Sequence, residues 1–415
     1  MLTTRASKTG AMDRGRFPCE RRRPWRRALP LGLAAAGLVS ATLALPAGAG
    51  PATSGAVSPG ATGAGSWAPP GTKPAEASYS YASVPDGTEG RIAGTAIGAD
   101  SALDGASLAK LRADGLNTVS LYVWWETGSD PTKVVQYSDT EPDSALGAEI
   151  SAVQAAGFRV VMTPVFWCAT CSGGWRGDLR LNGAGQVNAF FASYTAFVQH
   201  YADIAQRYGV SMYFVGSELS MLEGERAHWL SLISDIRGHY HGRLAYEENW
   251  DMLGRASFLS QVDDIAISAY FPLDDRPAPT LAQLVGDWTS SHAAATAGRN
   301  WVGALTHLAA SLHRPILFGE AGYMSGQYAA RAPYLDYYGQ PDWQVQADLY
   351  QALLETFSRQ PWWAGAIWYD WEYGNDTLAD GRTYRAKTAE ELLTMWYGEG
   401  MRPTSPTESL IPGGS

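Results

Sequence analysis

Residues 215–220 read VGSELS and residues 317–323 read LFGEAGY, and these two stretches decide the fold. Each continues a short apolar run that predicts a buried strand. Each then places one glutamate where the strand stops, Glu218 and Glu320, between small residues that let the backbone turn sharply. A buried strand that ends on a carboxylate is costly unless the carboxylate meets solvent, a partner or a ligand. The two strand ends therefore predict one pocket that contains a pair of catalytic carboxylates.

Helical and strand patterns alternate from about residue 91 to about residue 398. Strands are predicted over 91–97, 118–123, 158–165, 212–215, 244–246, 264–269, 315–318 and 363–368. Helices are predicted over 103–114, 144–156, 187–208, 225–240, 280–297, 301–312, 343–359 and 387–397. Eight strand–helix units in alternation argue for parallel strands, and a count of eight favours a closed barrel over an open sheet. We therefore expect an α/β protein with a single (β/α)8 TIM barrel and a disordered N-terminal linker.

The two ends of the chain predict export and flexibility. Residues 1–49 carry an arginine cluster, an apolar run and small residues suited to cleavage, which is typical of a signal peptide and predicts a secreted protein. The alternative is an uncleaved anchor, because the apolar run of about 18 residues approaches the length of a membrane span. Residues 50–90 are rich in Ala, Gly, Pro and Ser and predict a flexible linker. Residues 91–398 form the predicted catalytic domain, and residues 399–415 a flexible tail. No stable membrane span is expected once the signal is cleaved.

Composition excludes several classes of function. The 31 basic and 41 acidic residues give a net charge of -10, which argues against nucleic acid or an anionic membrane as a partner. None of the seven histidines lies at a predicted strand end, so we expect no metal. No glycine-rich phosphate loop is present, and we expect no cofactor. We expect a monomer.

Three cysteines are present, and Cys19 would leave with the signal peptide. The other two, Cys168 and Cys171, lie three residues apart, with no histidine nearby to complete a zinc site. In an exported protein this spacing favours a small disulfide that stiffens one loop.

The residues at the predicted strand ends are of the types that bind sugars. Flat Trp faces suit the apolar faces of pyranose rings, and Asn and Arg side chains can hydrogen-bond hydroxyls. Arg176 is equally compatible with a structural ion pair. The residues predicted to bind substrate are Trp124, Trp175, Arg176, Asn249, Trp250, Tyr270 and Trp368. Together with two carboxylates able to protonate a leaving oxygen and to attack an anomeric carbon, they predict glycoside hydrolysis.

Several motifs resemble glycoside hydrolase family 113 in their order along the chain. They are GSELS at 216–220, SAYFPL at 268–273, residues 315–323, WRG at 175–177, residues 246–251, and Trp229 with residues 236–237. That family belongs to a clan of retaining (β/α)8 barrels, and its known members are mainly β-mannanases. The resemblance implies that Glu218 is the general acid/base and Glu320 the nucleophile. It further implies that Tyr270 hydrogen-bonds the nucleophile and that Trp368 lies under the sugar being cleaved.

The sequence departs from the clan pattern in the same region. Ser217 stands where most of the clan has an Asn that contacts the sugar 2-hydroxyl, and Asn249 is the candidate replacement. Glu247 and Glu248 stand where small residues are expected, and the Cys168–Cys171 loop is unfamiliar. These differences concern the recognition of the sugar more than the class of reaction.

Together with the predicted export signal and the two glutamates, the resemblance implies a secreted, retaining endo-β-1,4-mannanase that acts on a polysaccharide or oligosaccharide. Two alternatives stay open. One is a β-glycosidase acting on a different β-glycan, namely a glucan, xylan or galactan. The other is a cell-surface barrel that binds carbohydrate without cleaving it.

Overall fold

In the computed structural model, the described residues are 90–98, 103–138, 140–335, 339–371 and 381–398. They all lie within one compact unit. The predicted signal peptide, linker and C-terminal tail fall outside the described residues, except for Gly90 at the linker's end.

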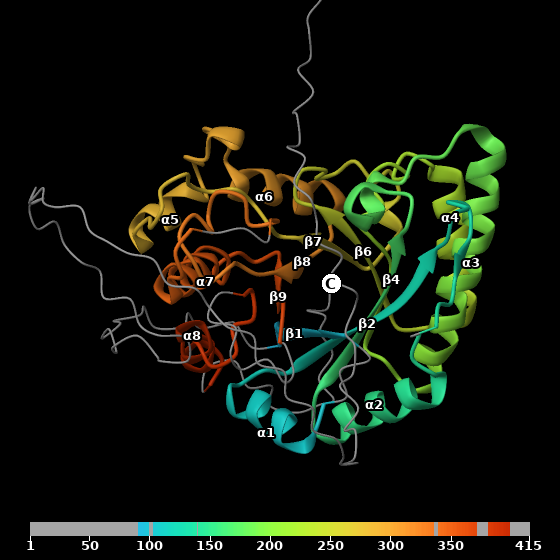
Figure 1. The fold of residues 1–415 in the computed structure, drawn as a ribbon, viewed down its shortest axis with the longest axis horizontal. Coiled ribbons are helices and arrows are strands. Elements are labelled where there is room, and N and C mark those ends of the chain that lie inside the picture. Colours follow the sequence, from blue (N-terminus) through green and yellow to red (C-terminus); the bar gives the residue numbers. More distant parts are fainter. Residues whose placement is uncertain (1–89, 99–102, 139, 336–338, 372–380, 399–415) are drawn as a thin grey trace, which may run out of the picture. The chain divides into compact units, whose positions relative to one another are not determined.

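Eight parallel strands form a closed ring, with helices around it (Figure 1). The ring closes because β1 pairs with both β2 and β9 in parallel register. The strands are β1 (Ile92–Gly98), β2 (Thr118–Thr127), β4 (Arg159–Cys168), β5 (Met212–Ser217), β6 (Arg243–Asn249), β7 (Asp264–Ser268), β8 (Ile316–Ala321) and β9 (Trp363–Trp368). The α-helices are α1 (Gly105–Ala113), α2 (Asp143–Ala155), α3 (Gly183–Arg207), α4 (Arg226–His239), α5 (Leu281–Asp287), α6 (Trp301–Leu312), α7 (Trp343–Phe357) and α8 (Thr388–Tyr397). The predicted (β/α)8 barrel is confirmed.

The core has two layers because both faces of the barrel strands are buried. A small cluster fills the barrel interior and includes Val161, Val165, Phe214 and Ile367. A much larger cluster lies between the strands and the helices. Alternate residues of a strand face opposite layers. Counting along a strand from a residue of known layer, such as Ile367, therefore shows which layer a side chain at the strand end faces.

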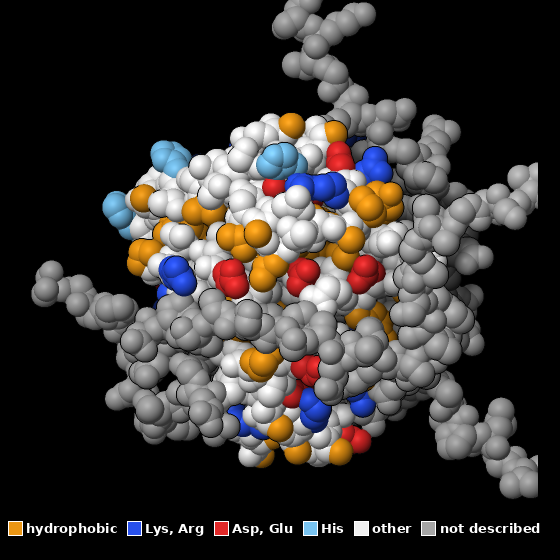
Figure 2. Space-filling view, turned by 90° about the vertical axis from the view of Figure 1, so that its left-hand side faces the viewer, with side chains coloured by type: hydrophobic (Ala, Val, Ile, Leu, Met, Phe, Trp, Pro, Cys, Tyr) orange, Lys and Arg blue, Asp and Glu red, His pale blue; other side chains and the backbone are white. Residues whose placement is uncertain are grey.

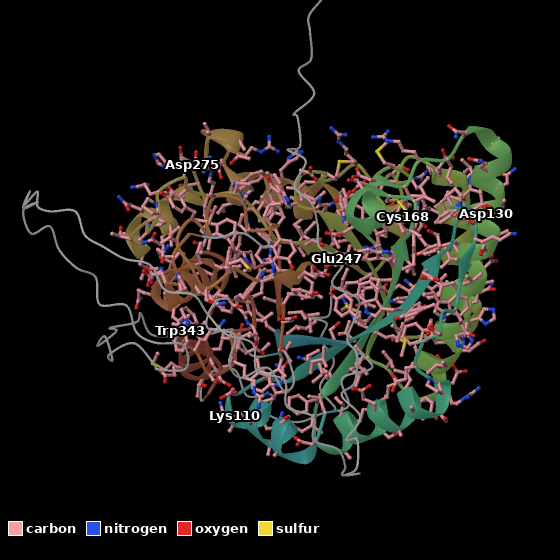
Figure 3. The ribbon with its side chains drawn as sticks, in the orientation of Figure 1. Lys110, Asp130, Cys168, Glu247, Asp275 and Trp343 are labelled. Carbon is pink, nitrogen blue, oxygen red and sulfur yellow. A yellow bond between two sulfur atoms is a disulfide. The ribbon has the colours of Figure 1, made fainter. Side chains whose placement is uncertain are left out.

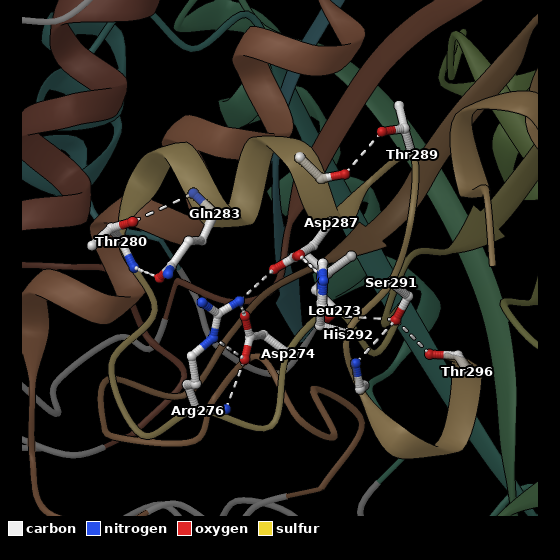
Figure 4. A network of polar contacts seen from close by, with 12 residues as sticks. Leu273, Asp274, Arg276, Thr280, Gln283, Asp287, Thr289, Ser291, His292 and Thr296 are labelled. Atoms are coloured by element: carbon white, nitrogen blue, oxygen red, sulfur yellow. Dashed lines mark hydrogen bonds and ion pairs between the residues drawn. The ribbon is translucent and has the colours of Figure 1, made fainter. Parts of the chain in front are cut away.

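Two details differ from the prediction. A short strand, β3 (Val134–Val135), pairs antiparallel with the end of β2 and had no sequence signal strong enough to predict it. The helix predicted over 280–297 ends early, as α5, and only a 3-10 turn at Ala294–Thr296 follows. The chain leaves the helical path because the Ser291 hydroxyl donates to the Pro272 carbonyl, and the backbone N–H groups of His292 and Ala293 donate to the Leu273 carbonyl. Figure 4 shows the Ser291 hydroxyl beside Leu273 and Thr296.

None of the helices in the described ranges is both long and apolar enough to span a bilayer. On the face drawn in Figure 2, acidic and basic side chains of the described residues are interspersed with apolar ones.

Candidate active site

Glu218 follows β5 directly and adopts a left-handed backbone conformation, with φ of 55°. Non-glycine residues rarely adopt this conformation, and it persists only where neighbouring groups hold it. The Glu218 N–H donates to the carbonyl oxygen of Glu247 on the adjacent strand β6, at 2.8 Å. The turn therefore brings a carboxylate that is 8% exposed to the carboxyl end of the barrel.

Two side chains from the loop after β4 hold one oxygen of Glu218. The indole Nε1 of Trp175 donates to Glu218 Oε2 at 2.8 Å, and Arg176 Nη2 lies 3.4 Å from the same oxygen. The Trp175 ring lies against Gly177, where any Cβ would come within 2.2 Å of the ring, so this position requires glycine. The other oxygen, Glu218 Oε1, has no hydrogen bond to a residue within the described ranges.

Arg176 is itself fixed by the residue before Glu218. Its Nε donates to the Ser217 carbonyl at 2.7 Å and its Nη2 to the Ser217 hydroxyl at 2.6 Å. Burial alone would lower the pKa of Arg176, but the carboxyl groups of Glu218, Glu320 and Glu247 raise it. Arg176 is therefore a permanent positive charge within the site, as an ion-pair partner of Glu218.

Glu320 lies in β8 and accepts one hydroxyl on each oxygen. Tyr122 donates to Oε1 at 2.9 Å and Tyr270 to Oε2 at 3.0 Å. Burial and the nearby Glu218 raise the pKa of Glu320, while Arg176 and the two tyrosine hydroxyls oppose that rise. The predicted bond from Tyr270 is confirmed. The role of Tyr122 was missed, although it shares the inward face of β2 with Trp124, and that spacing was the available signal.

A third carboxyl, Glu247 of β6, lies among these groups and was not predicted as a site residue. It is fully buried, and Figure 3 shows it within the ring of strands. The Ser217 hydroxyl donates to Glu247 Oε2 at 2.7 Å. Burial, followed by the charges of Glu320 and Glu218, raises the pKa of Glu247 well above its usual value. The sequence signal was the glutamate standing where small residues were expected.

The other predicted substrate-binding residues differ in location. Trp124 is partly exposed and packs against the interior cluster, so it lies at the mouth of the barrel. Asn249 is 8% exposed and its Nδ2 donates to Asp251 Oδ1 at 2.9 Å. Trp250 stacks on Tyr334, with ring centroids 5.5 Å apart. The contacts of Asn249 and Trp250 are thus with their own loop and its neighbours rather than with the two glutamates.

The prediction that Trp368 lies under the sugar is wrong for this structure. Its ring is fully buried and stacks on Tyr350 of α7, with centroids 4.2 Å apart. Its Nε1 donates to the Tyr397 hydroxyl of α8 at 3.0 Å. The reason is strand alternation: Ile367 faces the barrel interior, so Trp368 faces the helices.

The loop after β4 carries the predicted disulfide between Cys168 and Cys171, which is confirmed. Just before it, Trp167 is 46% exposed. Its ring lies against Gly174, where a Cβ would come within 1.9 Å of the ring, and Gly174 directly precedes Trp175. An exposed indole is thus held next to the loop that contacts Glu218.

Across the described ranges, no three or more His, Cys, Asp or Glu side chains are grouped so that they could hold a metal ion. The side chains gathered around Glu218 and Glu320 are a third carboxyl group, one arginine, and tyrosine and tryptophan donors.

Comparison with known proteins points to one family. The family model of Glycoside Hydrolase Family 113 matches residues 99–387. A family 113 β-1,4-mannanase structure aligns at 22% identity, over 75% of this chain and 99% of that one, with a TM-score of 0.63. The family 113 β-mannanase AaManA from Alicyclobacillus acidocaldarius, in complex with ManMIm, aligns at 24% identity over 74% and 97%, with a TM-score of 0.62. At such identities the structures show a shared fold. No curated protein matches the chain.

Proposed function

The chain belongs to glycoside hydrolase family 113, and from that membership we propose that it is a secreted, retaining endo-β-1,4-mannanase. Glycoside hydrolysis itself, and a polysaccharide or oligosaccharide substrate, follow from the family. The observation that carries the mechanism is the unequal environment of the two glutamates. Glu320 has a hydroxyl donor on each oxygen, whereas Glu218 keeps Oε1 without a partner in the described part of the chain.

This difference supports the two proposed roles. A carboxylate held by Tyr122 and Tyr270 is fixed in orientation and suits a nucleophile. An oxygen without a protein partner can hold a proton and deliver it to the glycosidic oxygen. Two carboxyl groups whose hydrogen-bond partners differ in this way are typical of sites in which one carboxyl acts as an acid and the other as a base or nucleophile.

In the first step, the Glu320 carboxylate attacks the anomeric carbon while Glu218 donates its proton to the glycosidic oxygen. The glycosidic bond breaks and an ester forms between Glu320 and the sugar. In the second step, the Glu218 carboxylate takes a proton from water, whose oxygen attacks the anomeric carbon and releases Glu320. Two displacements at one carbon retain its configuration. As the ester breaks, the hydroxyls of Tyr122 and Tyr270 stabilise the returning negative charge.

Support for mannan comes from the family, whose known members are mainly β-mannanases. Support for endo action comes from Trp167, an exposed indole that lies against Gly174 in the loop that contacts Glu218 and offers a flat face to a further sugar ring. Trp124 and Trp175 supply apolar surface at the mouth.

The test is to incubate the purified protein with β-mannan and mannohexaose and to follow the new reducing ends by proton NMR. We expect short manno-oligosaccharides whose β-anomer appears first and then mutarotates. An α-anomer that appears first would contradict retention. Products from another β-glycan, but none from mannan, would replace mannan by that glycan as the proposed substrate. If no glycan gives a product, the alternative is favoured in which the barrel binds carbohydrate without cleaving it.

Secretion and a monomeric state are further parts of this proposal. The disulfide Cys168–Cys171 supports an oxidising compartment, which suits an exported protein. Recovery of the protein from the culture medium with a new N-terminus before residue 90 tests cleavage of the signal. The mass measured by light scattering tests the monomer.

A further inference from the structure

Glu247 is a buried titratable group that the double displacement does not use. Its carboxyl lies between the chain segments that carry the two proposed catalytic glutamates. On one side, Oε2 accepts the Ser217 hydroxyl at 2.7 Å, and the backbone carbonyl of Glu247 accepts the Glu218 N–H at 2.8 Å. On the other side, Oε1 lies where a Cβ on Gly319 would be only 2.3 Å away. Gly319 directly precedes Glu320, so the absence of a side chain there makes room for this carboxyl.

The hydrogen bonds around Glu247 have a fixed direction. Arg176 donates to the Ser217 hydroxyl, which directs the hydroxyl hydrogen toward Glu247 Oε2. Oε1 is fully buried and has no hydrogen-bond partner among the described residues. A neutral carboxylic acid with its proton on Oε1 tolerates such a position far better than an ionised carboxylate, because an unpaired buried charge is very costly.

The net charge of the site also favours a neutral Glu247. In the free enzyme, the proposed mechanism needs Glu320 ionised and Glu218 protonated. In the ester intermediate, Glu320 is neutral and Glu218 is ionised. Either state has one negative charge, which Arg176 balances. An ionised Glu247 would leave a second, uncompensated negative charge in a buried site at both stages.

The groups that face Glu247 come from four different parts of the barrel. They are Tyr122 of β2, Arg176 of the loop after β4, Ser217 and Glu218 at the end of β5, and Glu320 of β8. Arg176 is the one cation in this set.

We propose that Glu247 is a positioning residue that stays uncharged throughout the reaction and holds Ser217, Arg176 and the turn at Glu218 in place. Its role in catalysis rests on the proposed function, whereas its neutrality does not. One consequence concerns Ser217, which replaces the clan's sugar-contacting Asn. Its hydroxyl is already engaged by Arg176 and Glu247, so it serves the internal network rather than the substrate.

The first test needs no activity. Wild type and Glu247→Gln are unfolded in urea at a series of pH values from about 5 to about 8. Gln has nearly the same shape but cannot ionise. A wild type that keeps Glu247 protonated must take up one proton on folding, so its stability falls with rising pH relative to the variant. The unfolding equilibrium constant of the wild type, divided by that of Glu247→Gln, should rise by up to about tenfold per pH unit. A ratio independent of pH would show an ionised Glu247 and overturn the proposal.

The second test uses Glu247→Leu, which keeps volume but removes the acceptor for Ser217. We expect kcat on mannohexaose to fall by at least about tenfold with KM unchanged, because Glu247 does not touch the substrate. Glu247→Gln should recover most of that loss, since its amide oxygen still accepts from Ser217. A KM effect without a kcat effect, or full activity in Glu247→Leu, would overturn the positioning role. If wild type hydrolyses no glycan, the proposed function fails while the unfolding test still decides the state of Glu247.

Discussion

Removing the Tyr122 hydroxyl should move the acid limb of the pH–activity profile upward. Glu320 must be ionised to attack, and the Tyr122 hydroxyl donates to its Oε1 at 2.9 Å. Tyr122 and Tyr270 oppose the rise in the pKa of Glu320 that burial and Glu218 cause. A buried hydrogen bond to a charged acceptor contributes about 1.5–3 kcal/mol, and one pKa unit corresponds to about 1.36 kcal/mol. Tyr122→Phe should therefore raise the acid limb by about 1–2 pH units.

The assay is kcat/KM on mannohexaose across the pH range, which reports the ionisation of groups in the free enzyme. Tyr270→Phe should shift the limb in the same direction, because its hydroxyl holds the other oxygen of Glu320 at 3.0 Å. Tyr213→Phe is the matched control. That hydroxyl is also fully buried, but it donates to the Val198 carbonyl between strands and helices. An acid limb that stays in place in both Tyr122→Phe and Tyr270→Phe would refute the assignment of Glu320 as the ionised nucleophile.

Three further predictions concern Trp167, the disulfide and Asp287. Trp167→Ala should lower kcat/KM on mannohexaose by about 5–30-fold, because about 1–2 kcal/mol of apolar contact with the sugar is lost. Hydrolysis of short aryl mannosides should not change, and equal losses on both substrates would contradict a remote sugar contact. Replacing Cys168 and Cys171 by Ser should destabilise the protein by at most about 2 kcal/mol in urea unfolding, because the closed loop is very short; a loss far above this value would give the disulfide a larger role. Burial and Asp274 raise the pKa of Asp287 to about 6. The protonated Asp287 therefore stabilises the fold below about pH 4, and this stabilisation is lost as the pH rises through about 6. Asp287→Asn should flatten this part of the curve of Tm against pH. A curve equal to that of the wild type would contradict the raised pKa of Asp287.

The barrel was predictable because its signals are local. Short apolar runs mark most of the strands, and the repeat of strand and helix leaves few other folds. The bounds of β9 and α6 agree with the prediction at both ends. The helix that was predicted too long, beyond α5, failed because Ser291 bonds to Pro272, a contact that no local pattern encodes.

The site was predictable only in part, because a parallel barrel buries both faces of its strands. Without an alternation of polar and apolar residues, the sequence does not tell which face a strand-end aromatic occupies. Trp368 was therefore assigned to the pocket although it faces α7 and α8. Tyr122 was overlooked for the same reason. Glu247 violates the rule that buried strands are apolar, and its place becomes understandable only with Ser217 and Gly319 beside it.

Trapping the glycosyl–enzyme ester identifies the nucleophile most directly. An activated 2-fluoro-β-manno-oligosaccharide slows both displacement steps, and the labelled peptide can then be identified by mass spectrometry. We predict one sugar per chain, attached to Glu320, with no label on Glu320→Gln. A label on Glu218 or Glu247, or no label under conditions in which wild type hydrolyses mannohexaose, would contradict the central claim that Glu320 is the nucleophile of a retaining glycoside hydrolase.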